Sequence, residues 1–216
     1  MNEKLACTIS RIHDSNVKAV LCASGVGSKA IAWLLEVPGA SNTILEGIIP
    51  YSQSSLINFI GSAPSSAVSE KTSQEMARSS YKKALLLREN NAEVIGVGCT
   101  GAISTNRERK GANHAYISIY SQNAMSSTHV ELRKGLRTRV EEEELISSLH
   151  LIETYAARQL LAGSTFSPLR SEMMRACAAI DFSDPENHDK HDLKSWVREN
   201  TPTDQRIFSV ATQTCT

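Results

Sequence analysis

Residues 17–28, VKAVLCASGVGS, decide the fold: an apolar run leads directly into a turn of glycines and small polar residues. The run has the length and composition of a buried strand. Residues 29–36, KAIAWLLE, then have the pattern of a short helix. Val37-Pro38-Gly39 ends that helix, because a residue before proline disfavours the helical region and glycine favours a helix C-terminus. The segment therefore predicts a strand, a tight turn and a helix.

A second strand followed by a small-residue turn is expected at residues 93–102. EVIGVGC at 93–99 is a nearly continuous apolar run, as in a strand covered on both faces, and Thr100-Gly101-Ala102 follows as a turn. Residues 115–120 and 127–132 alternate polar and apolar positions, which predicts an antiparallel pair. This order predicts an α/β protein with one sheet and helices on both faces. The other expected elements are helices at 3–14, at 54–61, after the capping residue Ser69 and from about Glu141, and a strand at 43–52.

Composition and charge exclude several classes of function. The 216 residues include 23 Lys and Arg against 23 Asp and Glu, and this balance argues against a nucleic-acid or membrane partner, which would require a basic excess. No apolar run approaches the roughly 18 to 20 residues of a membrane span, and the N-terminus lacks the pattern of a signal peptide. The five cysteines contain no CxxC spacing, which favours reduced thiols. We therefore expect a cytoplasmic protein.

The chain length predicts one domain with an appendage. Residues 1–162 contain all the strong elements, whereas the composition changes to a linker-like GSTFSPLRS from residue 163. The remainder, 163–216, contains only short helical segments and a hydrophilic run. We expect it to be a loosely attached, partly helical tail.

The turn at residues 24–28 is the first candidate site, because ligands of open α/β sheets bind beyond the carboxyl ends of strands. Gly25 and Gly27 would let the backbone approach a ligand, and the following helix directs free N–H groups and its dipole at an anion. Ser24 could be a nucleophile on a sharp turn, with neighbouring amides holding the oxyanion. The alternatives are that Ser24 or Ser28 caps the helix, or that the turn binds a phosphate passively.

The second candidate site follows Thr100 and Gly101. Arg107, Arg109 and Lys110 come shortly after this strand end, and three cations in one loop could hold a phosphate. The alternative is a solvated loop. Glu141 to Glu144 are best explained by favourable interaction with the dipole of the helix that they begin.

Neither a metal nor a cofactor is expected. His188 and His191 stand in a hydrophilic segment without nearby further ligands, which is a weak pattern for a metal site. His114, His129 and His150 fall on strand or helix positions, where a structural or exposed role is expected.

The stretch from Ser24 to Gly61 resembles, without a gap, the CinA C-terminal domain, a family of bacterial nicotinamide-nucleotide amidohydrolases. In that family the first turn has the sequence S-C-T-G-G, followed by a PGSS-like loop, a strand, Y-S and a glycine that closes the next helix. AVSE at 67–70 matches the start of the family's next helix, Thr100-Gly101 matches its T-G turn, and Lys110-Gly111 falls near its K-P-V-G-T. The resemblance covers about residues 3–162. The positions that match the first half of the pattern are Gly27, Gly39, Ser41, Gly47, Tyr51, Ser52 and Gly61.

The resemblance implies a three-layer α/β/α sandwich with a mixed central sheet that binds a nicotinamide mononucleotide-like ligand. Active members hydrolyse the carboxamide and release ammonia, using a serine that is activated by a lysine five residues after the motif tyrosine. Ser24 would be the nucleophile beside Tyr51, and Thr100 would contact the carboxamide. The phosphate would meet Arg107, Arg109 and Arg137. Gly25, Gly27, Ser28, Ser52, Gly101 and Lys110 complete the expected ligand-binding set.

The sequence departs from the family pattern at the catalytic base. Leu56 stands five residues after Tyr51 and cannot accept a proton, while Lys29 could be a relocated base or face solvent. Two hypotheses follow: an amidohydrolase with altered chemistry, or a non-catalytic nucleotide-binding or regulatory module, related to eukaryotic proteins in which a CinA-like segment precedes a nucleotidylyltransferase domain. Lys29 pointing into the pocket beside Ser24 would favour the first, and an apolar pocket floor around Leu56 with Lys29 in solvent would favour the second. Either form is compatible with a homo-oligomer.

Overall fold

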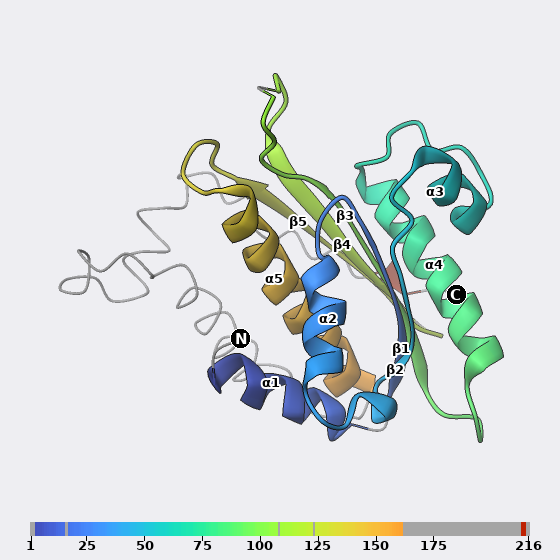
Figure 1. The fold of residues 1–216 in the computed structure, drawn as a ribbon. Coiled ribbons are helices and arrows are strands. Elements are labelled where there is room, and N and C mark those ends of the chain that lie inside the picture. The colour runs from blue at the N-terminus through green and yellow to red at the C-terminus, as the bar shows by residue number, and fades with distance from the viewer. Residues whose placement is uncertain (1–2, 16, 108, 123, 162–212, 215–216) are drawn as a thin grey trace.

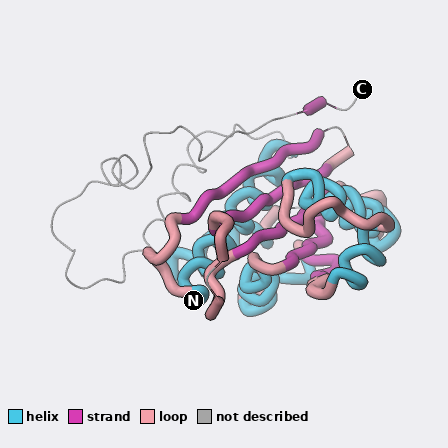
Figure 2. Tube along the Cα trace, turned by 90° about the horizontal axis from the view of Figure 1, so that it is seen from above, coloured by secondary structure: helices cyan, strands magenta, loops and turns pink. Residues whose placement is uncertain are grey.

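The computed structural model is a three-layer α/β/α sandwich (Figure 1). It describes residues 3–15, 17–107, 109–122, 124–161 and 213–214. One helical layer contains α1 (Glu3–His13), α2 (Ser28–Glu36) and α5 (Arg139–Leu161). The other contains α3 (Gln53–Ile60) and α4 (Glu70–Leu87), and the sheet lies between the layers, as the view from above also shows (Figure 2). The fold class expected from the sequence is confirmed.

The sheet is mixed, with strand order β2-β1-β3-β4-β5-β6. β1 (Lys18–Ser24) lies parallel to both β2 (Ile44–Ile48) and β3 (Val94–Ala102). β4 (Asn113–Tyr120) and β5 (Ala124–Leu132) form the expected antiparallel pair, and β4 runs antiparallel to β3. At the far edge, β6 (Gln213–Thr214) pairs with Met125 and Ala124 of β5.

Alternating residues of the strands face opposite helical layers and pack into hydrophobic clusters on both faces of the sheet. Leu21, Val97 and Ile117 face α1, α2 and α5 in the larger core. On the other face, Cys22 packs with Leu56 of α3 and Met76 of α4. This alternation follows from the two-residue period of a strand, and it decides which helical layer each strand-end side chain faces.

Glycines in β3 allow α4 to lie against the sheet. A Cβ on Gly96 would stand 2.1 Å from the Ala77 carbonyl oxygen, and one on Gly98 would stand 2.3 Å from the Ser73 carbonyl oxygen. Both carbonyls belong to the backbone of α4, which cannot move aside as a side chain would. The glycines thus let α4 pack directly on the sheet. The start of this helix, capped by Ser69, lies above the strand ends where the candidate site is found.

Two sequence-based boundaries were wrong. β2 ends at Ile48 rather than near residue 52, and Pro50, which lacks an N–H for the ladder, follows two residues later. The expected turn at Thr100–Ala102 is instead the last part of β3, where Thr100 pairs with both Ser24 and Tyr116. Within residues 163–216 only β6 is described, so the expected helical segments of the tail lie outside the described residues. No described helix is long and apolar enough to cross a membrane.

Candidate functional site

Ser24 is the last residue of β1, and its hydroxyl faces the chain that connects β2 to α3. Its Oγ donates a hydrogen bond to the Pro50 carbonyl oxygen at 2.9 Å, and the residue is buried. Thr100 lies beside it in register on β3, and its Oγ1 donates to the Ala67 carbonyl oxygen at 2.8 Å. The structure thus brings together the expected nucleophile and the expected carboxamide contact, and each hydroxyl is bonded to the backbone of a covering loop.

The glycines of the first turn are required by its packing against β3. Gly25 has φ +80°, and a Cβ there would lie 2.3 Å from the Gly101 carbonyl oxygen. Gly27 has φ +90°, and its Cβ would lie 2.7 Å from the Cys99 sulfur. Positive φ and close approach both exclude larger residues. Packing against β3 is therefore enough to explain why glycine occupies both positions, without a ligand that approaches the backbone.

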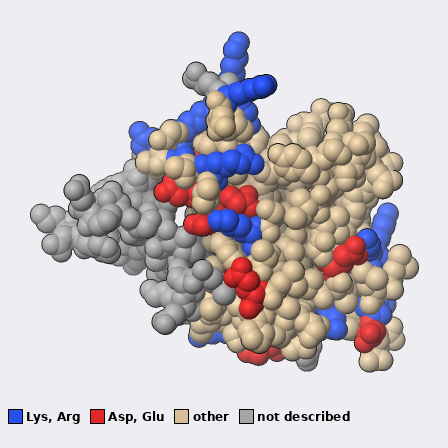
Figure 3. Space-filling view, in the orientation of Figure 1, with Lys and Arg blue, Asp and Glu red and all other residues tan. Residues whose placement is uncertain are grey.

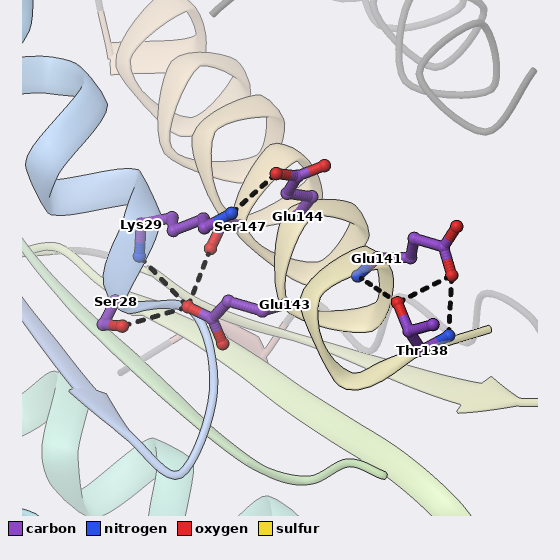
Figure 4. A network of polar contacts seen from close by, with 7 residues as sticks. All are labelled: Ser28, Lys29, Thr138, Glu141, Glu143, Glu144 and Ser147. Atoms are coloured by element: carbon purple, nitrogen blue, oxygen red, sulfur yellow. Dashed lines mark hydrogen bonds and ion pairs between the residues drawn. The ribbon is translucent and has the colours of Figure 1, made fainter. Parts of the chain in front are cut away.

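A carboxylate of the protein itself occupies the N-terminus of α2. Glu143 of α5 accepts hydrogen bonds from the hydroxyl of Ser28 at 3.0 Å and the backbone N–H of Lys29 at 3.1 Å (Figure 4). It also accepts one from the backbone N–H of Gly27 at 3.0 Å. Ser147, one helical turn later, donates to the same carboxylate at 3.3 Å. The donors that would receive a ligand phosphate are therefore already bonded to Glu143.

Lys29 points toward α5 and not toward Ser24. Its Nζ lies 2.6 Å from the Glu144 carboxylate, and both side chains are about one-third exposed (Figure 4). Ser24, by contrast, bonds to Pro50 in the connection from β2 to α3. The two candidate catalytic groups therefore have separate partners on different elements.

The position of the family lysine lies in an apolar environment. Leu56 is 2% exposed and packs with Cys22 and Met76 beneath α3. Tyr51 is 74% exposed, while Ser52 caps α3 by accepting a hydrogen bond from the Ser55 N–H at 3.2 Å. The apolar surroundings of Leu56 meet one part of the condition for the non-catalytic hypothesis, whereas Lys29 is paired with Glu144 and not simply in solvent.

The loop between β3 and β4 is held by α5 through a buried carboxylate. Glu142 is fully buried and accepts hydrogen bonds from the Ser104 N–H at 2.6 Å and the Asn113 side-chain amide at 2.9 Å. The guanidinium of Arg109 donates to the Ile103 carbonyl and the Asn113 side-chain oxygen. Arg109 therefore helps to shape this loop.

Basic side chains gather around this loop and the start of α5, at the upper left of the space-filling view (Figure 3). We call Arg107, Arg109, Lys110 and Arg137 the basic rim; Arg107 and Lys110 are exposed, and the other two are half-buried. Their sequence neighbour Arg139 donates to the Ser104 carbonyl at 2.9 Å. The rim lies at the end of the sheet where β3 finishes.

A row of residues across the sheet extends the site beyond those expected from the sequence. Strand register places Ser24, Thr100, Tyr116 and His129 side by side on β1, β3, β4 and β5. Tyr116 and His129 stack with ring centroids 4.4 Å apart and an interplanar angle of 9°. The alternation at 115–120 and 127–132 predicts which residues share a face, but it does not fix the register that brings these two rings together.

Two titratable groups are buried beneath the turn, and burial favours the neutral form of each. Burial lowers the pKa of His150 to about 4, against raising contributions from the Gly27 carbonyl and Glu143. Burial also raises the pKa of the Cys99 thiol, with Glu143 and Cys22 adding to the shift. A neutral imidazole and a protonated thiol pack here as part of the core. The described residues contain no group of three or more potential metal ligands, and His188 and His191 fall outside them.

The fold and the site define a class: a small α/β/α domain whose candidate ligand site lies at the ends of parallel strands, beside a serine turn. The chain belongs to the CinA C-terminal domain family, whose pattern matches residues 3–156. It is 26% identical over 148 residues to a competence-damage inducible protein of Natranaerobius thermophilus. That match covers 68% of this chain but only 35% of the relative, so the chain spans about a third of that protein's length.

Solved structures of CinA-type proteins share the fold. A CinA superfamily protein from Enterobacter cloacae has a TM-score of 0.57 at 18% identity, covering 71% of this chain and 90% of that one. The competence/damage inducible protein CihA from Agrobacterium tumefaciens has a TM-score of 0.52 at 18% identity, covering 76% and 96%. At this identity the likeness extends to the fold alone.

Proposed function

We propose that this chain is a CinA-type domain that binds a nicotinamide mononucleotide-type ligand without hydrolysing it. The observation that carries the proposal is that neither of the two positions considered for a base, Leu56 and Lys29, presents a free amine to Ser24. Leu56 fills the family's lysine position within the core, and Lys29 is paired with Glu144. A serine hydroxyl is a weak nucleophile unless a neighbouring group takes its proton.

The basic rim is the proposed place for the ligand's phosphate. The amides at the start of α2 are bonded to Glu143, so an additional anion there would meet a carboxylate of like charge. Arg107 and Lys110 are exposed at the tip of the β3–β4 loop, and Arg137 precedes α5. Arginine can hold a phosphate by paired hydrogen bonds and lysine by its point charge.

Ammonia release from nicotinamide mononucleotide, measured on the purified protein, tests the loss of chemistry. We expect turnover at or near background in the parent, because general-base assistance contributes about 10²–10⁴ in rate. Leu56→Lys tests whether restoring the amine restores activity, with Leu56→Met as the control for altered packing. Rapid turnover in the parent that disappears in both Ser24→Ala and Lys29→Ala would contradict the proposal and establish Lys29 as the base.

Calorimetric titration with the same nucleotide tests binding separately. Replacing Arg107 and Lys110 by alanine should weaken affinity about tenfold and reduce its salt dependence, because phosphate contacts are charge-assisted. Lys82, an exposed residue of α4, provides a matched control as Lys82→Ala. No binding by the parent would contradict the ligand assignment.

A further inference from the structure

Three half-buried rings on β4 and β5 form a surface that neither the catalytic nor the phosphate assignment uses. We call His114, Tyr116 and His129 the aromatic shelf. His114 meets Tyr116 edge to face with centroids 5.6 Å apart, and it meets His129 in the same way at 5.9 Å. With the stacked pair Tyr116 and His129, the three rings form one continuous cluster.

Carboxylates flank the aromatic shelf. Glu131 is directly opposite His114 in the β4–β5 ladder and is exposed. Glu70 is the first residue of α4, the helix above the strand ends. Partial burial raises the pKa of Tyr116, and Glu70 and Glu131 raise it further. Both carboxylates therefore lie close enough to the shelf to give it a negative potential.

The aromatic shelf shares a row of the sheet with Ser24 and lies next to the strand ends that the β3–β4 loop joins. Ser24, Thr100 and Tyr116 are consecutive members of one row across the sheet, and His114 pairs with Ala102 at the end of β3. The loop with Arg107 and Lys110 begins directly beyond that last pair. A ligand with a ring on the shelf and a phosphate at the rim would span adjacent surfaces of one site.

We propose that the aromatic shelf binds the positively charged pyridinium ring of the nicotinamide nucleotide. The inference rests on the proposed function, which supplies a ligand with such a ring. A cation over aromatic faces is attracted by the ring quadrupoles, and the attraction is stronger where nearby carboxylates add to it. A neutral ring of the same shape gains only the stacking contribution.

The imidazoles add a pH dependence with a definite sign. Partial burial is the main cause that lowers the pKa of His129, and His114 lowers it further, against the raising effect of Glu131 and Glu70. At neutral pH the His129 ring is therefore uncharged and accepts a cationic neighbour. As the pH falls and the His129 imidazole becomes protonated, it repels the ligand's ring, while Tyr116, whose pKa is raised, stays neutral.

The test compares nicotinamide mononucleotide with its reduced form by calorimetric titration. The two share the phosphate and ribose, but the reduced ring carries no positive charge. We expect the parent to bind the oxidised form about tenfold more tightly at pH 7.5, and to lose that preference progressively as the titration is repeated at lower pH. Glu131→Gln and Tyr116→Leu should each reduce the preference about threefold or more, whereas Glu89→Gln, the same change in the loop that precedes β3, should leave it unchanged.

A second probe, the 1-methylnicotinamide cation, separates this inference from the proposed function. If the nucleotide binds and neither shelf variant changes the preference for the oxidised ring, the shelf assignment is wrong and the nucleotide function stands. If the nucleotide fails to bind but the methylated ring binds and is weakened by Glu131→Gln, the shelf is correct and the nucleotide assignment is wrong. If neither ligand binds the folded parent, both proposals fail. Thermal melting of each variant verifies folding, and the exposed Glu131 gives a usable result even if Tyr116→Leu is unstable.

Discussion

At the scale of single residues, four successive glutamates in the first turns of α5 make different contacts. Glu141 caps its own helix, accepting a hydrogen bond from the Thr138 N–H at 2.6 Å (Figure 4). Glu142 is buried and holds the β3–β4 loop, Glu143 holds the start of α2, and Glu144 pairs with Lys29. The helix-dipole interpretation made from the sequence accounts for Glu141, but the other contacts are tertiary.

Glu143→Ala should destabilise the fold and create an anion site. The substitution removes the acceptor from the Gly27 and Lys29 amides, which we expect to lower the free energy of unfolding by about 1–3 kcal/mol. Sulfate should then raise the melting temperature of the variant more than that of the parent, because the exposed amides favour an anion. Glu144→Ala is the control, since its half-exposed ion pair should contribute under about 1 kcal/mol. Equal sulfate responses in all three proteins would contradict this role of Glu143.

His150 predicts a loss of stability in mild acid. Its folded pKa of about 4 lies below the ordinary value of 6.5, so the unfolded chain binds the extra proton between these values. The contribution to stability is therefore complete above pH 6.5 and is lost progressively as the pH falls toward 4. Urea unfolding should show a decrease of about 2 kcal/mol between pH 7 and 5 from this group. His150→Gln should flatten that dependence and Arg88→Gln should not; an unchanged slope in His150→Gln would show that another group is responsible.

At the scale of elements, α4 lies directly against β3 at the glycines of that strand. A Cβ on Gly98 would lie 2.3 Å from the Ser73 carbonyl oxygen and 2.7 Å from the Ala77 nitrogen. Gly98→Ala should therefore lower the free energy of unfolding by about 3 kcal/mol, because helix and strand backbones must separate. Gly111→Ala, at a position with nothing within 4 Å, should change it by less than about 0.5 kcal/mol in the same denaturant titration. Similar stabilities for the two variants would mean that α4 does not pack against β3 as closely as described.

The elements follow from the sequence more completely than the site does. Local signals are sufficient for β1, for α2 and for the Ser69 cap, whose side chain accepts from the Thr72 N–H. The continuation of β3 through Thr100–Ala102 was missed because small residues favour turns locally, whereas here pairing with both β1 and β4 keeps them extended. Pairing with two neighbouring strands thus outweighed the local preference of these small residues for a turn.

The site depends on contacts that no local pattern contains. Glu143 reaches Gly27 across 116 positions of sequence, and the Tyr116–His129 stack depends on the β4–β5 register. Leu56 is the exception, because the resemblance to the family pattern singled out this position from the sequence as one where a lysine is expected. Its buried, apolar environment explains how leucine is accommodated there.

At the scale of the whole molecule, the hydrophobic core that the structure describes is made by residues that precede residue 162. The described core residues extend from Leu5 to Leu151, and the later chain contributes β6, which pairs with β5 at only two positions (Figure 2). Small numbers of ladder pairs at a sheet edge contribute little compared with a buried core. The domain boundary that composition places near residue 162 therefore also predicts that removing the later residues will change the stability of the fold very little.

Limited proteolysis of the full chain should cut first between residues 163 and 195, leaving a folded fragment that ends near Leu161. Exposed, polar segments without a core of their own are the preferred sites of cleavage. A chain ending at residue 162 should melt within about 4 °C of the parent, because loss of two edge pairs corresponds to about 1 kcal/mol or less in a domain of this size. A chain ending at residue 145 serves as the control and should not fold, since it lacks Ile146, Leu149 and Leu151 of the core. Two results would contradict this boundary: resistance of residues 163–195 to protease, or a much larger fall in melting temperature on truncation at residue 162. Either would show that the C-terminal segment is an integral part of the fold.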